Sequence, residues 1–349
     1  MQSVSKFFDG GDIIANYKLD LEVRDGEFLV FLGPSGCGKT TALRMIAGLE
    51  TPSEGDIYFD DDRVTDMAPA DRNVAMVFQN YALYPHMSVR ENIEYPLKIR
   101  GVPPEERDER VAEIADLLHI EDQLDSDPAN ISGGQRQRTS LARAIIREPS
   151  VFLLDEPLSN LDAKLRLEMR SELKRLQNEL DITTVYVTHN QEEAMSMGDR
   201  IAVMNEGTIR QVADPEELYR RPRTAWVAEF IGSPPMNLLE GSRRNGAIHV
   251  DDENAVPATD DAPPDDVSVG FRPEDLAVTA TEPDTDWCLR GRVKTVEPLG
   301  EYVLVNVDVG DATVNAKVDH SDLESGQQVF VSVDRGDVYL YDGDGELVA

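Results

Sequence analysis

Eight residues between an apolar run and a helix-forming segment constrain the fold of this chain more than any other feature. Residues 33–40 read Gly-Pro-Ser-Gly-Cys-Gly-Lys-Thr and fit the pattern G-x-x-x-x-G-K-[ST]. The apolar run at residues 28–32 predicts a buried strand before the loop, and residues 41–47 predict a helix after it. The pattern alone could be a chance glycine-rich turn, but with both flanks in place it indicates an α/β fold with a phosphate-binding loop.

The residue types of this loop suit a nucleotide. Glycines let backbone N–H groups turn inward around phosphate oxygens, and the start of the following helix adds partial positive charge. Lys39 can reach the β- and γ-phosphates, and the hydroxyl of Thr40 can ligate Mg²⁺. The predicted nucleotide-binding residues of the loop are Gly33, Pro34, Ser35, Gly36, Cys37, Gly38, Lys39, Thr40 and Thr41.

Two adjacent carboxylates follow a second apolar run. Residues 151–157 read Val-Phe-Leu-Leu-Asp-Glu-Pro. They predict a strand that delivers Asp155 and Glu156 at its carboxyl end, where ligands of α/β sheets bind. Asp155 can hold Mg²⁺ through water, and Glu156 can polarise an attacking water. By itself this pattern also fits a strand that ends in a solvated acidic turn, but a phosphate-binding loop elsewhere in the chain favours a hydrolytic site.

The pattern along the chain changes once. At 349 residues the chain has room for about two domains. Residues 1–232 alternate apolar runs with helical stretches, as an α/β domain does, and a helical subdomain is expected at about residues 85–150. Short alternating runs separated by Gly, Pro and Asp predict a small all-β domain at residues 236–349, with an exposed acidic loop at 251–266. Strands are predicted at residues 28–32, 73–78, 151–154, 184–187 and 201–204, and helices at 105–118 and 163–180.

The net charge is unusually negative. With 34 basic and 67 acidic residues, the formal net charge is −33. Disorder would explain an acidic segment, but the hydrophobic share of 40% is ordinary for a folded chain. Binding of a polycation would need a localised patch, whereas the acidic residues are spread along the chain. The composition therefore resembles that of proteins from salt-loving organisms, among them halophilic archaea. The same charge argues against a nucleic-acid partner.

The sequence contains no segment that suggests secretion or membrane insertion. No stretch approaches the roughly 18–20 apolar residues of a membrane-spanning helix, and residues 1–6 lack the apolar core of a secretion signal. Cys37 and Cys288 lie far apart and suggest neither a disulfide framework nor a metal cluster. We therefore expect a soluble chain inside the cell, which would serve a membrane process only by docking to a partner.

A third motif points to a family. Residues 131–138 read Ile-Ser-Gly-Gly-Gln-Arg-Gln-Arg, with Ser132 as the expected helix N-cap. The motif resembles the signature sequence of ABC ATPases and stands, as in that family, between the phosphate-binding loop and the two acids. Gln79 matches the family's Q-loop, residues 159–162 match its D-loop, and His189 matches its switch histidine. A lone histidine at a strand end is more often structural, but five motifs at family spacing identify the first domain as a member of this family.

The resemblance implies a mechanism. In the family, two copies face each other head to tail, and each ATP lies between the phosphate-binding loop of one copy and the signature of the other. Glu156 would then be the general base for water, and His189 would contact the γ-phosphate. Gln79 would ligate Mg²⁺ together with Thr40 and Asp155. The further residues that the resemblance places against ATP are Ser132, Gly133, Gly134, Gln135 and Asp162.

Several segments resemble one class of ABC ATPases, the carbohydrate importers for maltose, glycerol phosphate and pentoses. These segments are residues 80–89, 158–163 and 229–237, and, in the β-rich part, 270–275 and 296–300. The last two resemble a regulatory, oligonucleotide-binding-like domain. The class implies a second ATPase subunit, two membrane-spanning permease subunits and an extracellular solute-binding protein as partners, and a peripheral location on the cytoplasmic side of the cell membrane.

Other functions stay open at this point. Importers of polyamines, iron or anions share the five motifs. A soluble ABC ATPase of translation or DNA repair would usually carry two ATPase domains or a long coiled-coil insertion, and neither is visible in the sequence. The β-rich domain could also be a nucleic-acid-binding module, which the charge disfavours, or could merely bury surface.

The sequence departs from the family in two places. Ile131 begins the signature where Leu is usual, which is a conservative change. Family members stack adenine on an aromatic residue after a first strand, and Phe8 is the candidate here, with Phe7 and Tyr17 as rivals. Few residues precede Phe8, so this strand is expected to be cut short, and the adenine contact is less secure than the phosphate site.

Overall fold

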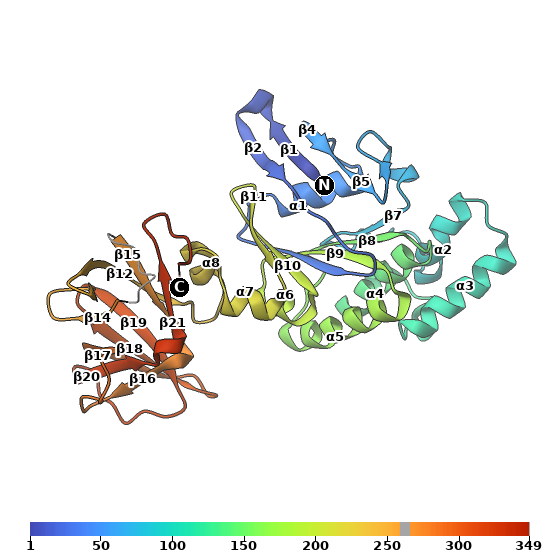
Figure 1. The fold of residues 1–349 in the computed structure, drawn as a ribbon. Helices are drawn as coiled ribbons and strands as arrows, with labels where there is room; N and C mark the ends of the chain where they lie inside the picture. Colours follow the sequence, from blue (N-terminus) through green and yellow to red (C-terminus); the bar gives the residue numbers. More distant parts are fainter. Residues whose placement is uncertain (259–265, 349) are drawn as a thin grey trace. The chain divides into compact units, whose positions relative to one another are not determined.

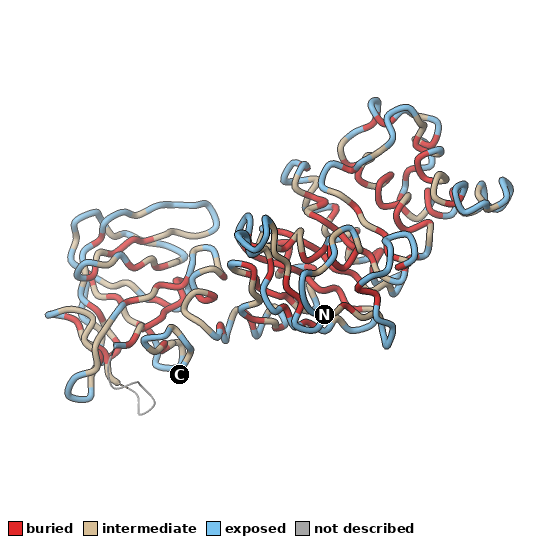
Figure 2. The backbone as a smooth tube through the Cα atoms, turned by 90° about the horizontal axis from the view of Figure 1, so that it is seen from above, coloured by how far each residue is buried: buried red, intermediate tan, exposed pale blue. Residues whose placement is uncertain are grey.

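The computed structural model describes residues 1–258 and 266–348. The contacts between residues divide the chain into two compact units, Met1–Pro215 and Glu216–Ala349. Each unit has its own buried interior (Figure 2). In the part of the chain that the structure describes, no helix has the length and apolar character needed to cross a membrane.

A six-stranded sheet forms the centre of the first unit, in the order β11-β10-β3-β9-β8-β7. Strand β3 (Phe28–Leu32) pairs in parallel with β9 and β10, and β8 pairs in parallel with β7 and β9. All five residues of β3 are buried, because both faces of a parallel sheet are covered, and this explains the uninterrupted apolar run. The other strands are β7 (Val74–Val77), β8 (Val151–Asp155), β9 (Thr183–Thr188), β10 (Arg200–Asn205) and β11 (Thr208–Ala213).

Helices cover this sheet on both faces (Figure 1). Helix α1 (Lys39–Ala47) lies between it and a small antiparallel sheet of order β2-β1-β4, and α5 (Ala163–Leu180) and α6 (Gln191–Met197) lie on the opposite face. Every strand and helix predicted for this unit is present, within a few residues of its predicted bounds. The smaller strands are β1 (Gln2–Phe8), β2 (Ile13–Leu19), β4 (Glu54–Asp56), β5 (Tyr58–Phe59) and β6 (Asp62–Arg63).

A helical subdomain separates β7 from β8 in the sequence. It contains α2 (Val89–Ile99), α3 (Pro104–Leu117) and α4 (Gly133–Ile145), and α2 contacts both other helices. Ser132 is the N-cap of α4, as predicted: its hydroxyl accepts from the backbone N–H of Gln135, and the Gln135 side chain accepts from the N–H of Ser132. Such a capping box stabilises a helix start by about 1 kcal/mol.

The second unit is rich in β structure, which confirms the predicted β domain. Its two five-stranded sheets have the orders β14-β13-β12-β15-β21 and β16-β20-β17-β18-β19. Their strands are β12 (Asn237–Arg244), β13 (Ala247–His249), β14 (Ala255–Pro257), β15 (Asp266–Phe271), β21 (Val338–Tyr341), β16 (Leu276–Thr279), β17 (Cys288–Pro298), β18 (Val303–Val309), β19 (Ala312–Val318) and β20 (Gln328–Val333).

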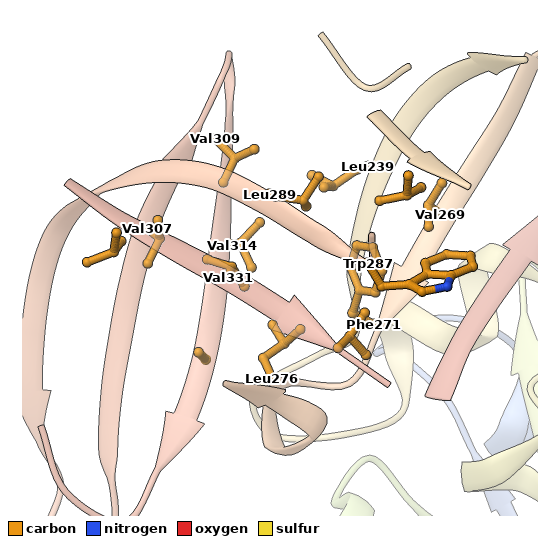
Figure 3. Packing of buried hydrophobic residues seen from close by; sticks show 14 of the residues in the cluster. Leu239, Val269, Phe271, Leu276, Trp287, Leu289, Val307, Val309, Val314 and Val331 are labelled. Atoms are coloured by element: carbon orange, nitrogen blue, oxygen red, sulfur yellow. The ribbon is translucent and has the colours of Figure 1, made fainter. Parts of the chain in front are cut away.

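Apolar side chains from both sheets fill the interior of this unit. Phe271, Trp287 and Val331 lie in one cluster with sixteen further buried residues, mostly valines and leucines (Figure 3). Burial of each such side chain stabilises the fold by about 1.5–3 kcal/mol. The loop expected at residues 251–266 contains strand β14, which pairs with β13, and ends on the first residue of β15, so that expectation was wrong for residues 255–257 and for Asp266. Residues 259–265 of the expected loop lie outside the described part.

Two short helices, α7 (Pro215–Arg220) and α8 (Ala225–Phe230), precede the sheets of the second unit. Arg272, only 1% exposed, donates to the carbonyls of Tyr219 at 2.7 Å and Ile231 at 2.5 Å. These bonds explain why residues 216–232 belong to the second unit by their contacts. The domain limits at residues 232 and 236 stay a prediction.

Candidate active site

The residues predicted for the phosphate-binding loop, the metal site and catalysis gather at one edge of the six-stranded sheet. Strands β3, β9, β8 and β7 are parallel neighbours, so their carboxyl ends lie together, at the place where α/β sheets bind ligands. The register aligns Leu32 with Thr188 and Asp155 with Val187. Residues 33–38 follow β3; Lys39, Thr40 and Thr41 begin α1; Gln79 follows β7; Asp155 ends β8 and Glu156 follows it; His189 follows β9.

The glycine-rich loop holds a lysine ammonium at its centre. Lys39 is 5% exposed, and its Nζ donates to the carbonyls of Gly33 at 2.8 Å and Pro34 at 2.9 Å. Residues 34–36 form the exposed top of the loop, and Gly38, with φ of +102°, turns the backbone into α1. Backbone N–H groups, a helix start and a fixed ammonium are the donors that phosphate oxygens require.

Packing beneath the loop requires two of its glycines. A Cβ on Gly33 would collide with the carbonyl oxygen of Met204, and one on Gly38 would collide with the carbonyl oxygen of Ala15. Cys37 is buried under the loop, and burial raises the pKa of its thiol even though Lys39 acts in the opposite direction. The side chain of Cys37 is therefore a neutral part of the packing.

The proposed metal ligands Thr40 and Asp155 contact each other. The Thr40 hydroxyl donates to Oδ1 of Asp155 at 2.9 Å. Burial raises the pKa of Asp155, while the hydrogen bond from Thr40 lowers it. A hydroxyl and a carboxylate are the hard oxygen ligands that Mg²⁺ prefers, so the pair fits this ion. The third candidate, Gln79, is exposed, and its backbone carbonyl accepts from the side-chain amide of Asn160 at 2.8 Å.

The two predicted catalytic residues also contact each other. Nδ1 of His189 lies 3.1 Å from Oε1 of Glu156. The backbone of Glu156 has φ of +45°, its N–H donates to the carbonyl of Val187 at 3.0 Å, and its carbonyl accepts from the Ser159 hydroxyl at 2.8 Å. The His189 side chain is 55% exposed and that of Glu156 is 21% exposed, so water can reach the pair.

The signature lies beside the start of α5. A Cβ on Gly134 would lie 3.0 Å from the Leu165 methyl groups, and one on Gly133 would lie 3.5 Å from a Leu161 methyl group. In the described residues, no hydrogen bond joins residues 132–135 to the phosphate-binding loop of the same chain. The structure thus does not bring these two motifs together within one chain.

Asp162 and Phe8 are two further residues that were predicted to bind the nucleotide. Asp162 is the N-cap of α5 and accepts from the backbone N–H of Leu165 at 3.0 Å. Phe8 ends β1, a strand of seven residues, and the Nζ of Lys6 lies 4.9 Å from its ring centroid. Within the described chain, no hydrogen bond or ring contact links Phe8 to the phosphate-binding loop, so its role with adenine stays a prediction, as do the roles of the other site residues.

Three residues near the site were missed by sequence reasoning. Fully buried Asn16 donates to the carbonyl of Gly38 at 3.2 Å, and no sequence signal marks it. Thr188 and Glu193 form hydrogen bonds around His189. The spacing of Asn190 and Glu193 is that of a helix start, which alone would have placed Glu193 at the surface.

The fold and the site together define a phosphate-binding-loop ATPase with an added β domain. Three family profiles match the chain: "ABC transporter" at residues 17–159, "MalK OB fold domain" at 232–276 and "TOBE domain" at 269–340. The chain belongs to the ABC transporter family of ATP-binding subunits, which are ATPases coupled to transport. These matches confirm the predicted α/β ATPase fold with an oligonucleotide-binding-like β domain.

Relatives of full length support this assignment. The chain is 48% identical to the trehalose/maltose import ATP-binding protein MalK of Thermococcus litoralis, over 95% of this chain and 94% of that one. It is also 48% identical to the xylose/arabinose import ATP-binding protein XacJ of Haloferax volcanii, over 96% and 91%. Among solved structures, the dimeric ATP-binding cassette MJ0796 in a post-hydrolysis state with ADP and Pi matches with a TM-score of 0.56 and 32% identity, over 61% of this chain and 97% of that one.

Proposed function

We propose that this chain supplies the energy for an ABC importer of sugars, by binding and hydrolysing ATP with Mg²⁺. The observation that carries the proposal is the extent of the similarity to sugar-import ATP-binding proteins, which spans both units and 95% of the chain. The similarity includes the β domain with its segment at residues 270–275. The first unit alone would not distinguish between importer classes, because importers of other solutes share its five motifs.

The residues at the sheet edge fit the chemistry. Lys39 and the loop N–H groups hold the phosphates, and Thr40, Asp155 and Gln79 would hold Mg²⁺, which when bound neutralises charge on the phosphate oxygens. Glu156 accepts the proton of the attacking water, and His189, 3.1 Å from it, orients the carboxylate. Most of the rate then comes from positioning and from fixed charge.

The chain would work in pairs. Among the residues that the structure describes, no hydrogen bond joins the signature residues 132–135 to the phosphate-binding loop of their own chain, which supports a role for them at the nucleotide of a second copy. The second subunit is either another copy of this chain or a sister chain. We place this pair on two membrane-spanning permease subunits at the cytoplasmic side of the cell membrane, with an extracellular solute-binding protein that delivers the sugar.

The test is growth of a strain deleted for this gene on a panel of single carbon sources, with uptake of radiolabelled sugars measured alongside. Loss of growth and uptake on one sugar or a related pair would support the proposal and name the substrate. Unchanged uptake of every sugar, with loss of polyamine, iron or anion uptake, would replace the sugar by that solute. Unchanged uptake of all solutes in a strain that also lacks sister ATPases would reject a role in import.

A further inference from the structure

A buried carboxylate lies close to the catalytic pair. A polar cavity of about 70 Å³ is lined by Glu156 and His189 and also by Glu193, which is only 4% exposed. Burial of a charged carboxylate costs several kcal/mol unless donors replace the lost water. The hydrogen-bond donors around the Glu193 carboxylate therefore explain how it can be buried.

Glu193 accepts hydrogen bonds from two hydroxyl groups. Its Oε2 accepts from the Tyr186 hydroxyl and from the Thr188 hydroxyl, each at 2.7 Å. The Tyr186 side chain is fully buried, and this burial raises its pKa well above the ordinary value, so it stays a neutral donor. These two bonds differ in their position, because Thr188 is the last residue of β9 and directly precedes His189, whereas Tyr186 lies two residues further back in the strand.

The bond from Thr188 to Glu193 belongs to a set of hydrogen bonds around the turn that carries His189. While the Thr188 hydroxyl donates to Glu193, its oxygen accepts from the backbone N–H of Asn190 at 3.0 Å. The Asn190 side chain in turn accepts from the backbone N–H of Glu193 at 3.1 Å. His189 thus lies between two residues that are both tied to Glu193, which leaves the turn little freedom.

A second connection runs to the loop before α5. The Nε atom of Arg166 lies 3.8 Å from Oε1 of Glu193. The same guanidinium donates to the carbonyls of Leu158 at 3.4 Å and Leu161 at 2.9 Å. Through Arg166, Glu193 also contacts the segment that directly follows Glu156.

We propose that Glu193 is a positioning residue for ATP hydrolysis, which fixes His189 through Thr188 and the loop after Glu156 through Arg166. Glu193 does not touch the reacting atoms; it sets the geometry in which His189 meets Glu156. The proposal rests on the proposed roles of Glu156 and His189.

The two hydroxyl donors provide the test. If Glu193 were only a structural contact of the core, removal of either hydroxyl would lower the melting temperature and leave kcat unchanged. Under the proposal, Thr188→Val lowers kcat about 10- to 100-fold with KM for ATP nearly unchanged, because a small displacement of a catalytic group costs that much. Thr188→Ser, which keeps the hydroxyl, restores kcat, and Tyr186→Phe keeps kcat within about twofold of the parent chain.

The measurements use the purified full chain. They are steady-state kcat and KM for ATP, the melting temperature, and hydrogen exchange of the Asn190 amide without nucleotide, which should be faster in Thr188→Val and unchanged in Tyr186→Phe. Glu193→Gln should lower kcat, while Glu192→Gln is the matched control, since Glu192 is 80% exposed and pairs with Arg170. If Thr188→Val fails to fold, the kcat of Glu193→Gln, compared with that of Glu192→Gln, tests the proposal instead.

Either of two results would overturn the proposal. One is an unchanged kcat in folded Thr188→Val or Glu193→Gln, and the other is a loss in Thr188→Ser as large as in Thr188→Val. Glu156→Gln, measured alongside as a reference, separates failure of the proposed catalytic site from failure of the positioning role of Glu193. If that variant hydrolyses ATP at the parent rate, the proposed catalytic site itself is wrong; if it is inactive while the Glu193 variants are normal, only the positioning role is rejected.

Discussion

The hydroxyl of Thr40 donates to Asp155 at 2.9 Å, although 115 positions separate the two residues in the sequence. Helix α1 brings the first residue and strand β8 the second, and both meet at the carboxyl edge of the sheet. Because burial raises the pKa of Asp155 and this hydrogen bond opposes the rise, the contact helps to keep the carboxylate charged, as its proposed role as a Mg²⁺ ligand requires.

Loss of the Thr40 hydroxyl should raise the Mg²⁺ concentration that ATP hydrolysis requires. In Thr40→Val the opposing hydrogen bond is gone, so the pKa of Asp155 rises further and one oxygen ligand is lost. We expect the Mg²⁺ concentration for half-maximal ATPase activity to rise about tenfold or more. Thr40→Ser, which keeps the hydroxyl, is the control and should behave like the parent chain. Equal Mg²⁺ dependence in Thr40→Val and the parent would exclude Thr40 as a ligand.

Replacement of the proposed general base should separate binding from turnover. Glu156→Gln keeps the size of the side chain but cannot accept a proton, so we expect hydrolysis to fall about 100-fold or more while ATP affinity is retained. The bound nucleotide should then trap the paired form, which size-exclusion chromatography with ATP detects. Glu168→Gln, at an exposed position of α5, serves as the control. Full turnover in Glu156→Gln would remove Glu156 from its role.

The buried side chain of Arg272 should be essential for the stability of the second unit. Arg272 donates to the carbonyls of Tyr219, Ala228 and Ile231, and its guanidinium carbon lies 4.0 Å from the Tyr219 ring centroid. Arg272→Met leaves these carbonyls without a donor, and we expect a loss of about 3 kcal/mol in the free energy of unfolding.

Tryptophan fluorescence during urea unfolding measures this loss selectively, since both tryptophans, Trp226 and Trp287, lie in the second unit. Arg335→Met, at an exposed position, is the control and should change stability by less than about 0.5 kcal/mol. An unfolding curve of Arg272→Met that overlays the parent curve would show that the carbonyls find other partners at no cost.

Salt should stabilise this protein. A net charge of −33 destabilises the compact state by self-repulsion, and dissolved ions screen that repulsion. Screening is nearly complete at about 1 M salt, where the Debye length is about 3 Å. We therefore expect the melting temperature to rise steeply with KCl up to about 1 M and more slowly above it. A melting temperature that falls with added KCl over this range would contradict the expectation.

Local patterns predicted the elements of the first unit well. The uninterrupted apolar run at residues 28–32 became β3, because both faces of a parallel sheet are covered. Residues 163–180 became α5, because a helix that is buried on one face has apolar residues three and four positions apart. The pattern failed at residues 255–257, where a three-residue edge strand with a proline is too short to show any period.

The sequence by itself determined the chemistry of this protein: the phosphate-binding loop, the acids Asp155 and Glu156, the signature and their order along the chain. Their residue types and spacing are properties of short segments, so they can be recognised without a fold. Only the tertiary structure decided which groups meet. The burial of Glu193 and Arg272, and the contact between Thr40 and Asp155, depend on the order of strands in the sheets and on the packing of distant helices, which no short segment encodes.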